Sequence, residues 1–489
     1  MSSGEYDIIV IGGGSAGIVS GVTAAGLGAK TLLIEKQRLG GECSWTGCVP
    51  SKALLHAASI AHRMRNAGQC GLPPCAISRE QAAGALAYVR EMVERVRIAD
   101  DSAGLLAEMG AEVVFGEAVF TGPDRLDFEG KTLRARQFVL CTGSRPTVPD
   151  IPGLEEAGYL TNQTLFDLTE VPESLVVIGG GPVGVEMAQA FARLGSRVTI
   201  LTRGPRLLER DDAELTEMLM RYLQEEGITI HLNAKIERIE RRAGSKVVAA
   251  HIGEEPVEVP AEAILVATGR APNVEGLNLD RAGVRVEKEG VPVDARLHTT
   301  GPRVWACGDV LGRYQFSHMA EYEARTAVLN ALFPLRQKAR FRLVPWTTFT
   351  DPELAHAGLT EQEAKEKGLR FAVYRHPFDR DDRALVDGEG KGLVKLIVAE
   401  GWRGRILGAQ ILGPRAGELI HVPLLAMERG LTVRALADLI TVYPKLNISI
   451  QRAAQRWYQR LGERPPVRAL LNAYFRYLTP RSLSLKGRG

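Results

Sequence analysis

The chain has 489 residues, too many for one hydrophobic core, and this length predicts about three domains. Its 45% hydrophobic and 24% charged residues are typical of a globular α/β protein and argue against a disordered or fibrous one. The net charge is +3, from 61 basic and 58 acidic residues, so the overall charge gives no case for nucleic-acid binding.

The cysteine content and the N-terminus indicate the cellular setting. No apolar run approaches the roughly 18 residues that span a membrane. Glu5 and Asp7 lead directly into a predicted strand, so we expect no signal peptide. Six cysteines in a chain of this length do not form a disulfide framework. We therefore expect a cytoplasmic protein in which any disulfide is catalytic.

A glycine-rich loop follows the first predicted strand. A strand is expected over residues 7–11, a helix after the glycine loop of residues 12–17 and up to residue 27, and a second strand over residues 31–34. Gly12, Gly14 and Gly17 match the G-x-G-x-x-G pattern, which allows a tight turn, the approach of a pyrophosphate, and helix–strand packing. Glu35 ends the second strand, where its carboxylate can hold both hydroxyls of a ribose. This combination predicts a dinucleotide-binding βαβ unit.

Two cysteines follow this unit closely. Cys43 and Cys48 precede the apolar helical run of residues 53–58. One helical turn brings residues at this spacing close enough for a disulfide, and a helix N-terminus favours the thiolate. A redox dithiol beside a nucleotide site indicates electron transfer through sulfur. The first nucleotide site is therefore expected to hold a flavin.

The glycine pattern returns after a second strand, over residues 175–178. Gly179, Gly181 and Gly184 take the three glycine positions. A helix up to residue 194 and a strand over residues 198–201 are expected next. Thr202 stands where an acid would bind a ribose 2′-hydroxyl, and Arg203 and Arg206 suit a 2′-phosphate. This favours NADPH, with NADH as the alternative if the arginines are only solvated loop charges.

Two further features are less specific. Cys70 and Cys75 could form an auxiliary redox pair or half of a metal site, but incidental cysteines are the favoured interpretation. Cys141 and Cys307 end predicted strands and are interpreted as structural.

The C-terminal tail is basic and amphipathic. Arginines recur every four residues at Arg452, Arg456 and Arg460. Apolar residues at helical spacing then follow Pro466: Leu470, Leu471, Tyr474, Phe475 and Leu478, with Tyr477 beside them. The tail could contact an anionic membrane or a partner protein, but packing across the protein's own dimer is favoured.

These motifs together resemble the pyridine nucleotide-disulfide oxidoreductases, over roughly residues 5–460. Besides the glycine loops and the dithiol, four segments carry the resemblance: residues 141–146, 267–273, 306–309 and 350–361. The family implies an α/β fold with two Rossmann-like dinucleotide-binding domains, for FAD and NAD(P), and a C-terminal α+β dimerisation domain. The expected bounds are 1–148 and 273–342 for the FAD domain, 149–272 for the NAD(P) domain, 343–465 for the dimerisation domain, and 466–489 for the tail.

The resemblance also assigns site residues. The implied FAD contacts are Gly12, Gly14, Ser15, Ala16, Gly17, Glu35, Lys36, Gly41, Lys52, Thr142, Gly143 and Asp309. The implied NAD(P) contacts are Gly179, Gly181, Val183, Gly184, Arg203, Arg206 and Gly269. By the same resemblance, Cys48 is the thiol nearer the flavin, Cys43 is the outer interchange thiol, and Lys52 lies near flavin N5 and is neutralised by Glu186.

One departure from the family limits the function. The family's His-Pro-Thr-x-x-Glu segment, supplied by the partner subunit of a homodimer, reads Tyr443-Pro444-Lys445-Leu446-Asn447-Ile448 here. A phenol with a reference pKa of about 10 is a poor base near neutral pH. The sequence around Cys43 and Cys48 resembles that of the mercuric reductase-like branch of the family. However, no cysteine follows Cys307 in the sequence.

The sequence thus predicts an NAD(P)H-dependent flavoprotein oxidoreductase. Electrons would pass through Cys43 and Cys48 to a thiol, disulfide or soft-metal acceptor, with Tyr443 of the second subunit placing the substrate or donating a proton. Two alternatives remain. The flavin could reduce a quinone or another diffusible acceptor directly, or the protein could be a slow redox sensor recruited by its basic tail.

Overall fold

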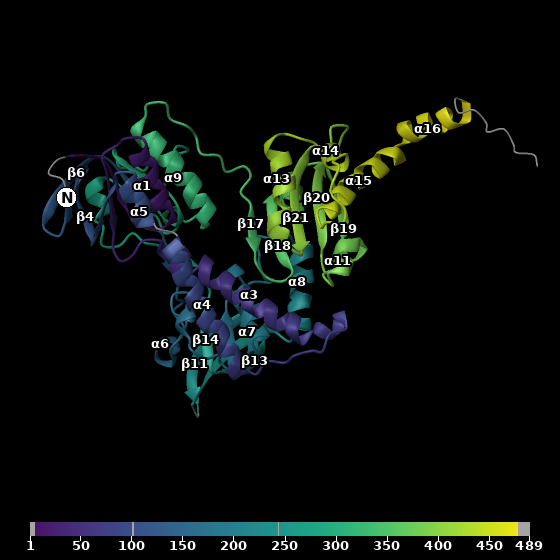
Figure 1. The fold of residues 1–489 in the computed structure, drawn as a ribbon, viewed down its shortest axis with the longest axis horizontal. Coiled ribbons are helices and arrows are strands. Elements are labelled where there is room, and N and C mark those ends of the chain that lie inside the picture. The colour runs from purple at the N-terminus through teal and green to yellow at the C-terminus, as the bar shows by residue number, and fades with distance from the viewer. Residues whose placement is uncertain (1–4, 100–101, 243, 478–489) are drawn as a thin grey trace, which may run out of the picture. The chain divides into compact units, whose positions relative to one another are not determined.

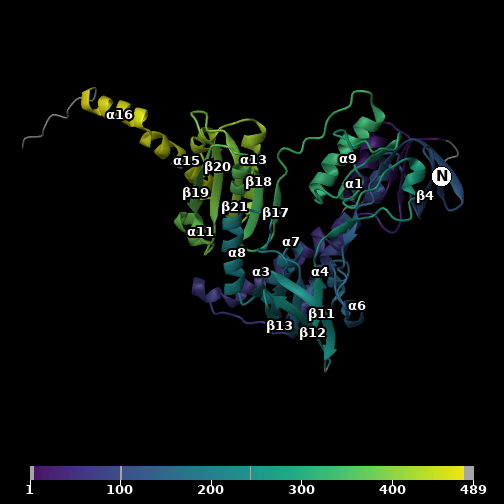
Figure 2. The ribbon, with the colours of Figure 1, turned by 180° about the vertical axis from the view of Figure 1, so that it is seen from behind.

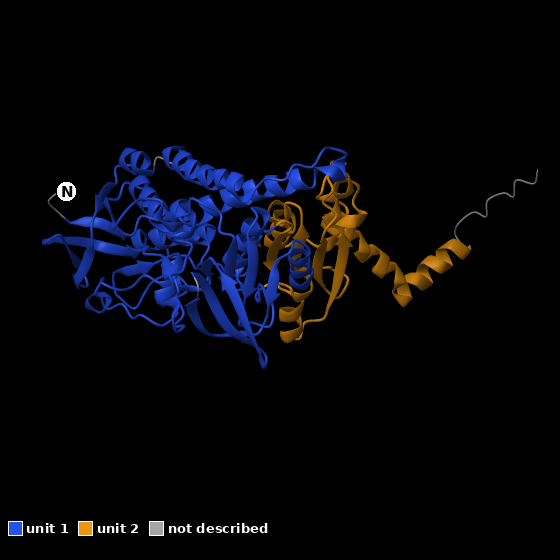
Figure 3. Ribbon diagram, turned by 90° about the horizontal axis from the view of Figure 1, so that it is seen from below, with its two compact units in different colours: residues 1–210, 216–344, 348–350 blue, residues 211–215, 345–347, 351–489 orange. Residues whose placement is uncertain are grey.

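The computed structural model describes residues 5–99, 102–242 and 244–477. The chain forms two compact units, coloured separately in Figure 3. Unit 1 contains residues 1–210, 216–344 and 348–350, and unit 2 contains residues 211–215, 345–347 and 351–489. Within the described part of the chain, no helix is long and apolar enough to cross a membrane.

The first sheet of unit 1 is mostly parallel and is built around the first glycine loop. Its strands are β1 (Tyr6–Ile11), β2 (Thr31–Glu35), β3 (Glu112–Phe115), β4 (Ala118–Gly122), β5 (Arg125–Phe128), β6 (Lys131–Leu140) and β16 (Val304–Ala306). The order is β3-β2-β1-β6-β5-β4, and β16 pairs with β6 in parallel. Because β16 comes late in the chain, the first and second expected FAD segments share one sheet.

The segments that contact this sheet are α1 (Ser15–Gly26), α5 (Ser102–Glu108), η3 (Leu279–Ala282) and α9 (Ser317–Leu332). They cover a core of aliphatic side chains from its strands. The other helical segments in this part of the chain are α2 (Gly41–Trp45), α3 (Cys48–Arg65), η1 (Ala67–Cys70), α4 (Arg79–Ala99) and η4 (Asp309–Leu311). Figure 1 shows α1 and α9 side by side. Small residues on α1, including Ala16 and Ala24, are buried and allow this close packing.

A second parallel sheet surrounds the second glycine loop. Its strands are β8 (Ser174–Ile178), β9 (Arg197–Leu201), β10 (Thr229–His231) and β14 (Ala263–Val266), in the order β10-β9-β8-β14. The helices α7 (Pro182–Arg193) and α8 (Ala213–Glu225) follow β8 and β9 in the chain. The strands predicted around both glycine loops, and the C-terminal ends of the predicted helices, are confirmed to within one residue.

Smaller elements complete unit 1. An antiparallel sheet contains β11 (Ala234–Arg242), β12 (Ser245–Ile252) and β13 (Glu255–Ala261). The strands β7 (Ser144–Pro146) and β15 (Arg270–Pro272) pair with each other. Two short helical segments are α6 (Leu154–Ala157) and η2 (Leu165–Asp167).

Unit 2 contains a five-stranded sheet in the order β17-β18-β21-β20-β19 (Figure 2). The strands are β17 (Trp346–Thr348), β18 (Glu353–Gly358), β19 (Phe371–Pro377), β20 (Leu393–Ala399) and β21 (Ile406–Gly413). The helical segments are α10 (Glu361–Glu366), η5 (Phe378–Arg380), α11 (Asp382–Val386), α12 (Ala416–Leu419), α13 (His421–Glu428), α14 (Val433–Ala437), α15 (Ile448–Glu463) and α16 (Pro465–Tyr477). Helices α13 and α15 pack on this sheet.

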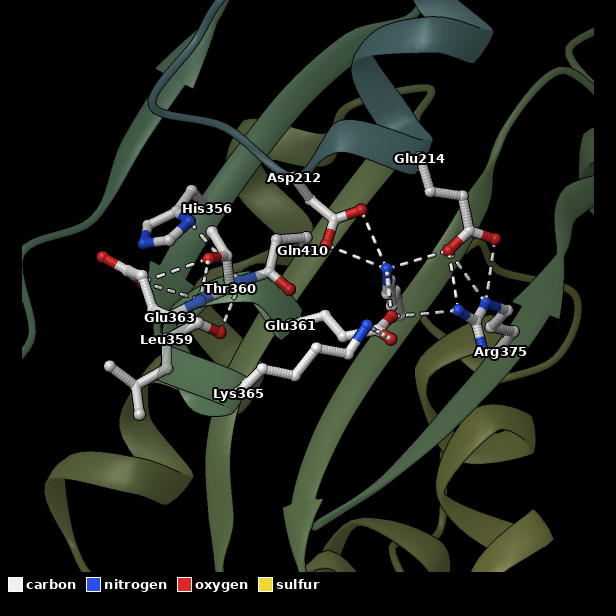
Figure 4. Close-up of polar contacts among 11 residues, drawn as sticks. Asp212, Glu214, His356, Leu359, Thr360, Glu361, Glu363, Lys365, Arg375 and Gln410 are labelled. Atoms are coloured by element: carbon white, nitrogen blue, oxygen red, sulfur yellow. Dashed lines mark hydrogen bonds and ion pairs between the residues drawn. The ribbon is translucent and has the colours of Figure 1, made fainter. Parts of the chain in front are cut away.

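A buried ion cluster fixes the segment before α8 within unit 2. The ammonium group of Lys395 lies 2.8 Å from carboxylate oxygens of Asp212 and Glu214 and 2.9 Å from one of Glu361. Arg375 also pairs with Glu214, at 2.8 Å. In Figure 4, dashed lines that end on the carboxylates of Asp212 and Glu214 mark these ion pairs. Because three acids surround the buried lysine, the cluster depends strongly on its charge.

Candidate active site

The predicted thiol pair lies across a break between two helices. Cys43 is in α2, whereas Cys48 is the first residue of α3. The expectation that one helical turn joins the two thiols is therefore wrong. The chain turns at Gly47, where a Cβ would lie 2.9 Å from the carbonyl oxygen of Glu42. A side chain at position 47 would clash with this backbone, so the turn that brings the thiols together requires glycine.

A hydrogen bond between the two thiols separates their acidities. This bond lowers the pKa of Cys48 to about 6, and the Ser317 hydroxyl, 3.5 Å away, and the Lys52 charge act in the same direction against the effect of burial. The same thiol–thiol bond raises the pKa of Cys43 well above its ordinary value. At neutral pH, reduced Cys48 is therefore the thiolate and Cys43 the protonated thiol. No sequence motif pointed to Ser317, which begins α9.

Lys52 is held in place by two groups. Its ammonium nitrogen lies 2.9 Å from Oε2 of Glu186, a buried side chain. The same nitrogen lies 4.2 Å from the centre of the Phe349 ring. The other oxygen of Glu186 accepts a hydrogen bond of 3.0 Å from the Phe349 amide. The structure thus brings together Lys52 and Glu186, the pair that the resemblance assigned to the flavin site.

The first glycine loop forms a cradle that only glycines permit. A Cβ on Gly12 would lie 2.4 Å from the Cys141 carbonyl oxygen, and one on Gly17 would lie 1.8 Å from the Gly12 carbonyl oxygen. A Cβ on Gly41 would lie 2.7 Å from Cα of Gly14. Gly14 caps α1 without a side-chain hydrogen bond, which leaves amide donors for an anion. These residues fit the pyrophosphate of FAD.

Polar side chains around the cradle are also ordered. The Glu35 carboxylate accepts hydrogen bonds of 2.6 Å from the Gly13 amide and 2.7 Å from the Gln37 amide. Its position at the end of β2 is the one predicted for a ribose-binding acid. Lys36, assigned as a cofactor contact, pairs with Glu117 at 2.7 Å. The assigned residues Ser15 and Ala16 form the first turn of α1.

The second FAD segment is tied to the first by hydrogen bonds. Oδ2 of Asp309 accepts a bond of 2.7 Å from the Ser144 hydroxyl. The guanidinium of Arg270 donates to the same hydroxyl, at 2.8 Å, and forms an ion pair with Glu42 beside Cys43. Sequence reasoning missed Arg270 and Glu42 as partners, because 228 residues separate them in the chain.

The two strand-end segments interlock through a pair of reciprocal bonds. The Thr142 hydroxyl donates to the backbone carbonyl of Asn273 at 2.6 Å, and the side-chain amide of Asn273 donates to the backbone carbonyl of Thr142 at 2.9 Å. Gly143 and Gly269 both adopt positive φ, at 69° and 138°. These bonds tie the segment that follows β6 to the segment that follows β15.

The second glycine loop repeats the geometry of the first. A Cβ on Gly179 would lie 2.3 Å from the Ala267 carbonyl oxygen, and one on Gly184 would lie 2.3 Å from the Gly179 carbonyl oxygen. Gly181 caps α7 without a side-chain bond, and a Cβ there would meet nothing within 4 Å. Val183 is 42% exposed in the first turn of α7. This loop also fits a pyrophosphate.

The arginines after β9 differ in their surroundings. Thr202 is buried, and Arg203 is exposed. Arg206 donates a hydrogen bond to the Glu209 carbonyl. Arg203 is therefore the better placed of the two to meet a ligand from solvent.

Tyr443 lies on an exposed loop of unit 2. Its hydroxyl donates a hydrogen bond of 3.0 Å to Oδ2 of Asp382, and 64% of its surface is exposed. The hydrogen bond and the charge of this carboxylate raise the pKa of Tyr443. Ile448, at the position of the family's glutamate, begins α15. Asp382, which sequence reasoning missed, is thus the acidic partner of residue 443 in this chain.

The Cys70/Cys75 pair and the described part of the C-terminal tail lie at the surface. Cys70 and Cys75 are exposed and not disulfide-bonded. Among the residues that the structure describes, no group of three or more His, Cys, Asp or Glu could hold a metal ion. In the tail, α16 exposes Leu470 and Phe475, by 71% and 64%. Leu478 and the remainder of the expected tail lie outside the described residues.

Comparisons with known proteins identify the family. Residues 6–324 match the pyridine nucleotide-disulphide oxidoreductase family, and residues 344–454 match its dimerisation domain. A mercuric reductase from Bacillus cereus is 39% identical over 440 residues, covering 90% of this chain and 69% of the relative. A dihydrolipoyl dehydrogenase from Thermus scotoductus is 35% identical over 466 residues, covering 93% of this chain and 98% of the relative.

A solved structure extends the likeness to the whole fold. It is the copper(II) complex of RclA, an HOCl-induced flavoprotein disulfide reductase from Escherichia coli, with a TM-score of 0.83 and 30% identity. The match covers 93% of this chain and 99% of that one. These findings confirm the fold class of two nucleotide-binding domains and a dimerisation domain. The chain therefore belongs to the pyridine nucleotide-disulphide oxidoreductases, a family of FAD- and NAD(P)-binding flavoprotein enzymes.

Proposed function

We propose that this enzyme passes electrons from NADPH, through FAD and the Cys43/Cys48 pair, to a soft metal ion that binds thiolates. The observation that carries the proposal is the raised pKa of Tyr443, which stands at the position of the family's histidine. Reduction of a disulfide substrate releases thiols whose protons need an acid/base group near neutral pH. Tyr443, hydrogen-bonded to Asp382 and with a raised pKa, is a poor base there. A metal ion captured by thiolates needs less proton transfer.

The chain's own residues then have distinct roles. Bound FAD supplies a carrier that accepts hydride from the nicotinamide and delivers two electrons to sulfur. Lys52, held by Glu186, places a positive charge near the thiolate of Cys48. Cys43 is the outer thiol and binds the acceptor. Tyr443 of the second subunit of a homodimer faces Cys43 and positions the acceptor.

The overall reaction balances without a further reactant. One NADPH gives NADP⁺, one proton and two electrons. These electrons reduce one mercury(II) ion to the metal, or two copper(II) ions to copper(I). The thiol pair returns to its starting oxidation state in each cycle.

Two relatives support a metal acceptor. Mercuric reductases are similar over 90% of this chain or more, and RclA has been solved as a copper(II) complex. Since no larger metal-binding group occurs among the described residues, the thiol pair itself is the proposed metal contact.

The choice of NADPH rests on Arg203 and Arg206 after β9. Arg203 is exposed beside the buried Thr202, so it can approach a 2′-phosphate. The ratio of kcat/KM for NADPH and NADH tests this choice. Arg203→Ala should lower that ratio by about tenfold, as expected for the loss of one charged contact.

Other assignments belong to the same proposal. The domain bounds given above, the cytoplasmic setting and the homodimer with a shared active site stay predictions. The exposed apolar side chains of α16 support a contact of the tail with a second copy of the chain.

A panel of acceptors tests the proposed function. NADPH oxidation by the FAD-loaded enzyme would be followed with mercury(II), copper(II), lipoamide, glutathione disulfide and a soluble quinone. We expect turnover with a metal ion and little with either disulfide. Tyr443→His should raise turnover with the disulfides, whereas the matched Tyr443→Phe should not. Faster turnover of a disulfide than of both metals by the wild-type enzyme would contradict the proposal.

A further inference from the structure

A second pair of cysteines lies buried beneath the FAD cradle. The sulfur atoms of Cys141 and Cys307 are 3.5 Å apart, and neither side chain is more than 5% exposed. The hydroxyl of Ser20, on α1, lies 3.6 Å from the first sulfur and 4.0 Å from the second. The reaction proposed for Cys43 and Cys48 does not use this second pair.

The backbone places the two cysteines side by side. Cys141 directly follows β6 and Cys307 directly follows β16, and these strands run parallel with Leu140 opposite Ala306. Each cysteine thus stands one residue beyond a register pair. Neighbouring strands are about 4.8 Å apart, which falls within the Cα separation of about 4.4–6.8 Å that disulfides span.

Both cysteines continue directly into the residues assigned to FAD. The Cys141 carbonyl oxygen lies against Gly12, and Thr142 and Gly143 come next in the chain. Cys307 precedes Gly308, whose amide donates a hydrogen bond of 2.8 Å to the buried Glu323, and then Asp309. A covalent link between the two cysteines would therefore join the strand ends that carry the two FAD segments.

We propose that Cys141 and Cys307 are a second redox site, which a small hydroperoxide converts to a disulfide that fastens the two FAD segments together. Burial restricts the site to small, neutral oxidants. The link would close a chain segment of 166 residues and so stabilise the folded state.

The oxidation proceeds in two balanced steps. The Cys141 sulfur attacks the peroxide, forms a sulfenic acid and releases one water molecule. The Cys307 thiol then attacks that sulfur, the S–S bond forms, and a second water leaves. The two thiols together give up two electrons and two protons, which the peroxide takes up as it becomes two water molecules. Hydrogen bonding to Cys141 and burial raise the pKa of Cys307, which disfavours Cys307 as the attacking thiol.

Six cysteines in the chain allow a clean experiment. Replacing Cys43, Cys48, Cys70 and Cys75 by serine leaves only Cys141 and Cys307. The FAD-loaded variant would be treated with hydrogen peroxide, denatured in an alkylating reagent and analysed by mass spectrometry. We expect the treated protein to have an intact mass two hydrogen atoms below that of the reduced, unalkylated protein. Digestion should give a linked peptide pair that contains both cysteines. Before denaturation, the treated protein should have a higher melting temperature, and dithiothreitol should reverse this rise.

A matched control and a second preparation keep the test decisive. Adding Cys307→Ala to the same variant should abolish the linked peptides and the rise in melting temperature. If the serine variant does not fold, peptide mapping of the peroxide-treated wild-type holoenzyme gives the same readout. Cys141 and Cys307 that both remain alkylatable, or that gain oxygen without becoming linked, would overturn the proposal.

Discussion

Cys48 is the residue whose ionisation the structure specifies most directly. The thiol–thiol hydrogen bond, Ser317 and Lys52 lower its pKa to about 6. In the reduced enzyme, the thiolate absorbance of Cys48 should therefore appear as the pH rises through about 6. Lys52→Met should move this midpoint to higher pH, because it removes a nearby positive charge. The measurement is an ultraviolet pH titration, with reduced Cys48→Ser subtracted as background.

A charge-retaining control separates electrostatics from packing. Lys52→Arg should leave the midpoint much closer to that of the wild type than Lys52→Met does. An unchanged midpoint in Lys52→Met would show that the charge of Lys52 does not act on this thiol.

Asp382 fixes the state of Tyr443 through one hydrogen bond. Since the carboxylate raises the pKa of Tyr443, Asp382→Asn should lower that pKa toward 10, as seen in a spectroscopic titration against Tyr443→Phe. We also expect Tyr443→Phe to lower kcat with a metal acceptor by about tenfold, which is less than the roughly 10²–10⁴-fold typical of a general acid or base, because a metal acceptor needs less proton transfer.

The step of the reaction that Tyr443→Phe slows distinguishes a role in positioning the acceptor from a purely structural role. The rate of flavin reduction by NADPH should be the same in Tyr443→Phe and in the wild type. Slower flavin reduction would place Tyr443 on the input side of the reaction and contradict its proposed role.

Individual residues were predictable where a local pattern defines them. Cys48, Lys52 and the acid Glu35 stand at fixed offsets from a strand or a helix start, so the sequence pointed to them. Ser317 and Asp382 reach the site from elements that no motif marks. Their contacts depend on tertiary packing, which single-sequence reasoning does not determine.

At the scale of elements, the buried Lys395 cluster supports the structure of unit 2. Removing the buried cation of this cluster takes an ion-pair partner from Asp212, Glu214 and Glu361, although Arg375 stays paired with the last two. Lys395→Met should therefore lower the free energy of unfolding by about 3–5 kcal/mol. Lys365→Met removes an exposed partner of Glu361 and should cost less than about 1 kcal/mol. Denaturant titration of both FAD-loaded variants checks these values, and equal losses would contradict a special role for Lys395.

The same cluster predicts a pH dependence. Burial opposes ionisation of Glu361, but hydrogen bonds and charge from Lys365 and Lys395 lower its pKa from 4.5 to about 2. A lowered pKa stabilises the folded state above pH 4.5, and this contribution is lost as the pH falls toward 2. Between these values, the free energy of unfolding should fall less steeply with decreasing pH in Lys395→Met than in the wild type.

Elements were predicted well where the sequence rule is local. The strands beside Gly12 and Gly179 and the C-terminal ends of the helices that follow were placed to within one residue, because close backbone contacts demand those glycines. The break at Gly47 was missed. One helical turn was expected to join Cys43 and Cys48, but α2 ends at Trp45 and α3 begins at Cys48. A side chain at position 47, between the two helices, would clash with the Glu42 carbonyl oxygen.

For the whole molecule, the family motifs were sufficient to predict the cofactor-binding and dimerisation domains, because each nucleotide site carries its own signature. The acceptor was harder to predict, since it depends on what replaces the family's histidine and glutamate. Tyr443 and Ile448 mark that departure in the sequence, and the bond to Asp382 gives it a physical basis. Electrons therefore enter this family of enzymes at the nucleotide-binding domains, and we propose that they leave this enzyme at Cys43.

The most direct test of this exit compares the wild-type enzyme with Cys43→Ser. Both FAD-loaded proteins would be mixed with NADPH, and flavin reduction and the subsequent reduction of mercury(II) or copper(II) would be followed separately. We predict that flavin reduction persists in Cys43→Ser, whereas metal reduction is lost. Metal turnover by Cys43→Ser at the wild-type rate would contradict the sulfur route and indicate direct transfer from flavin to the acceptor.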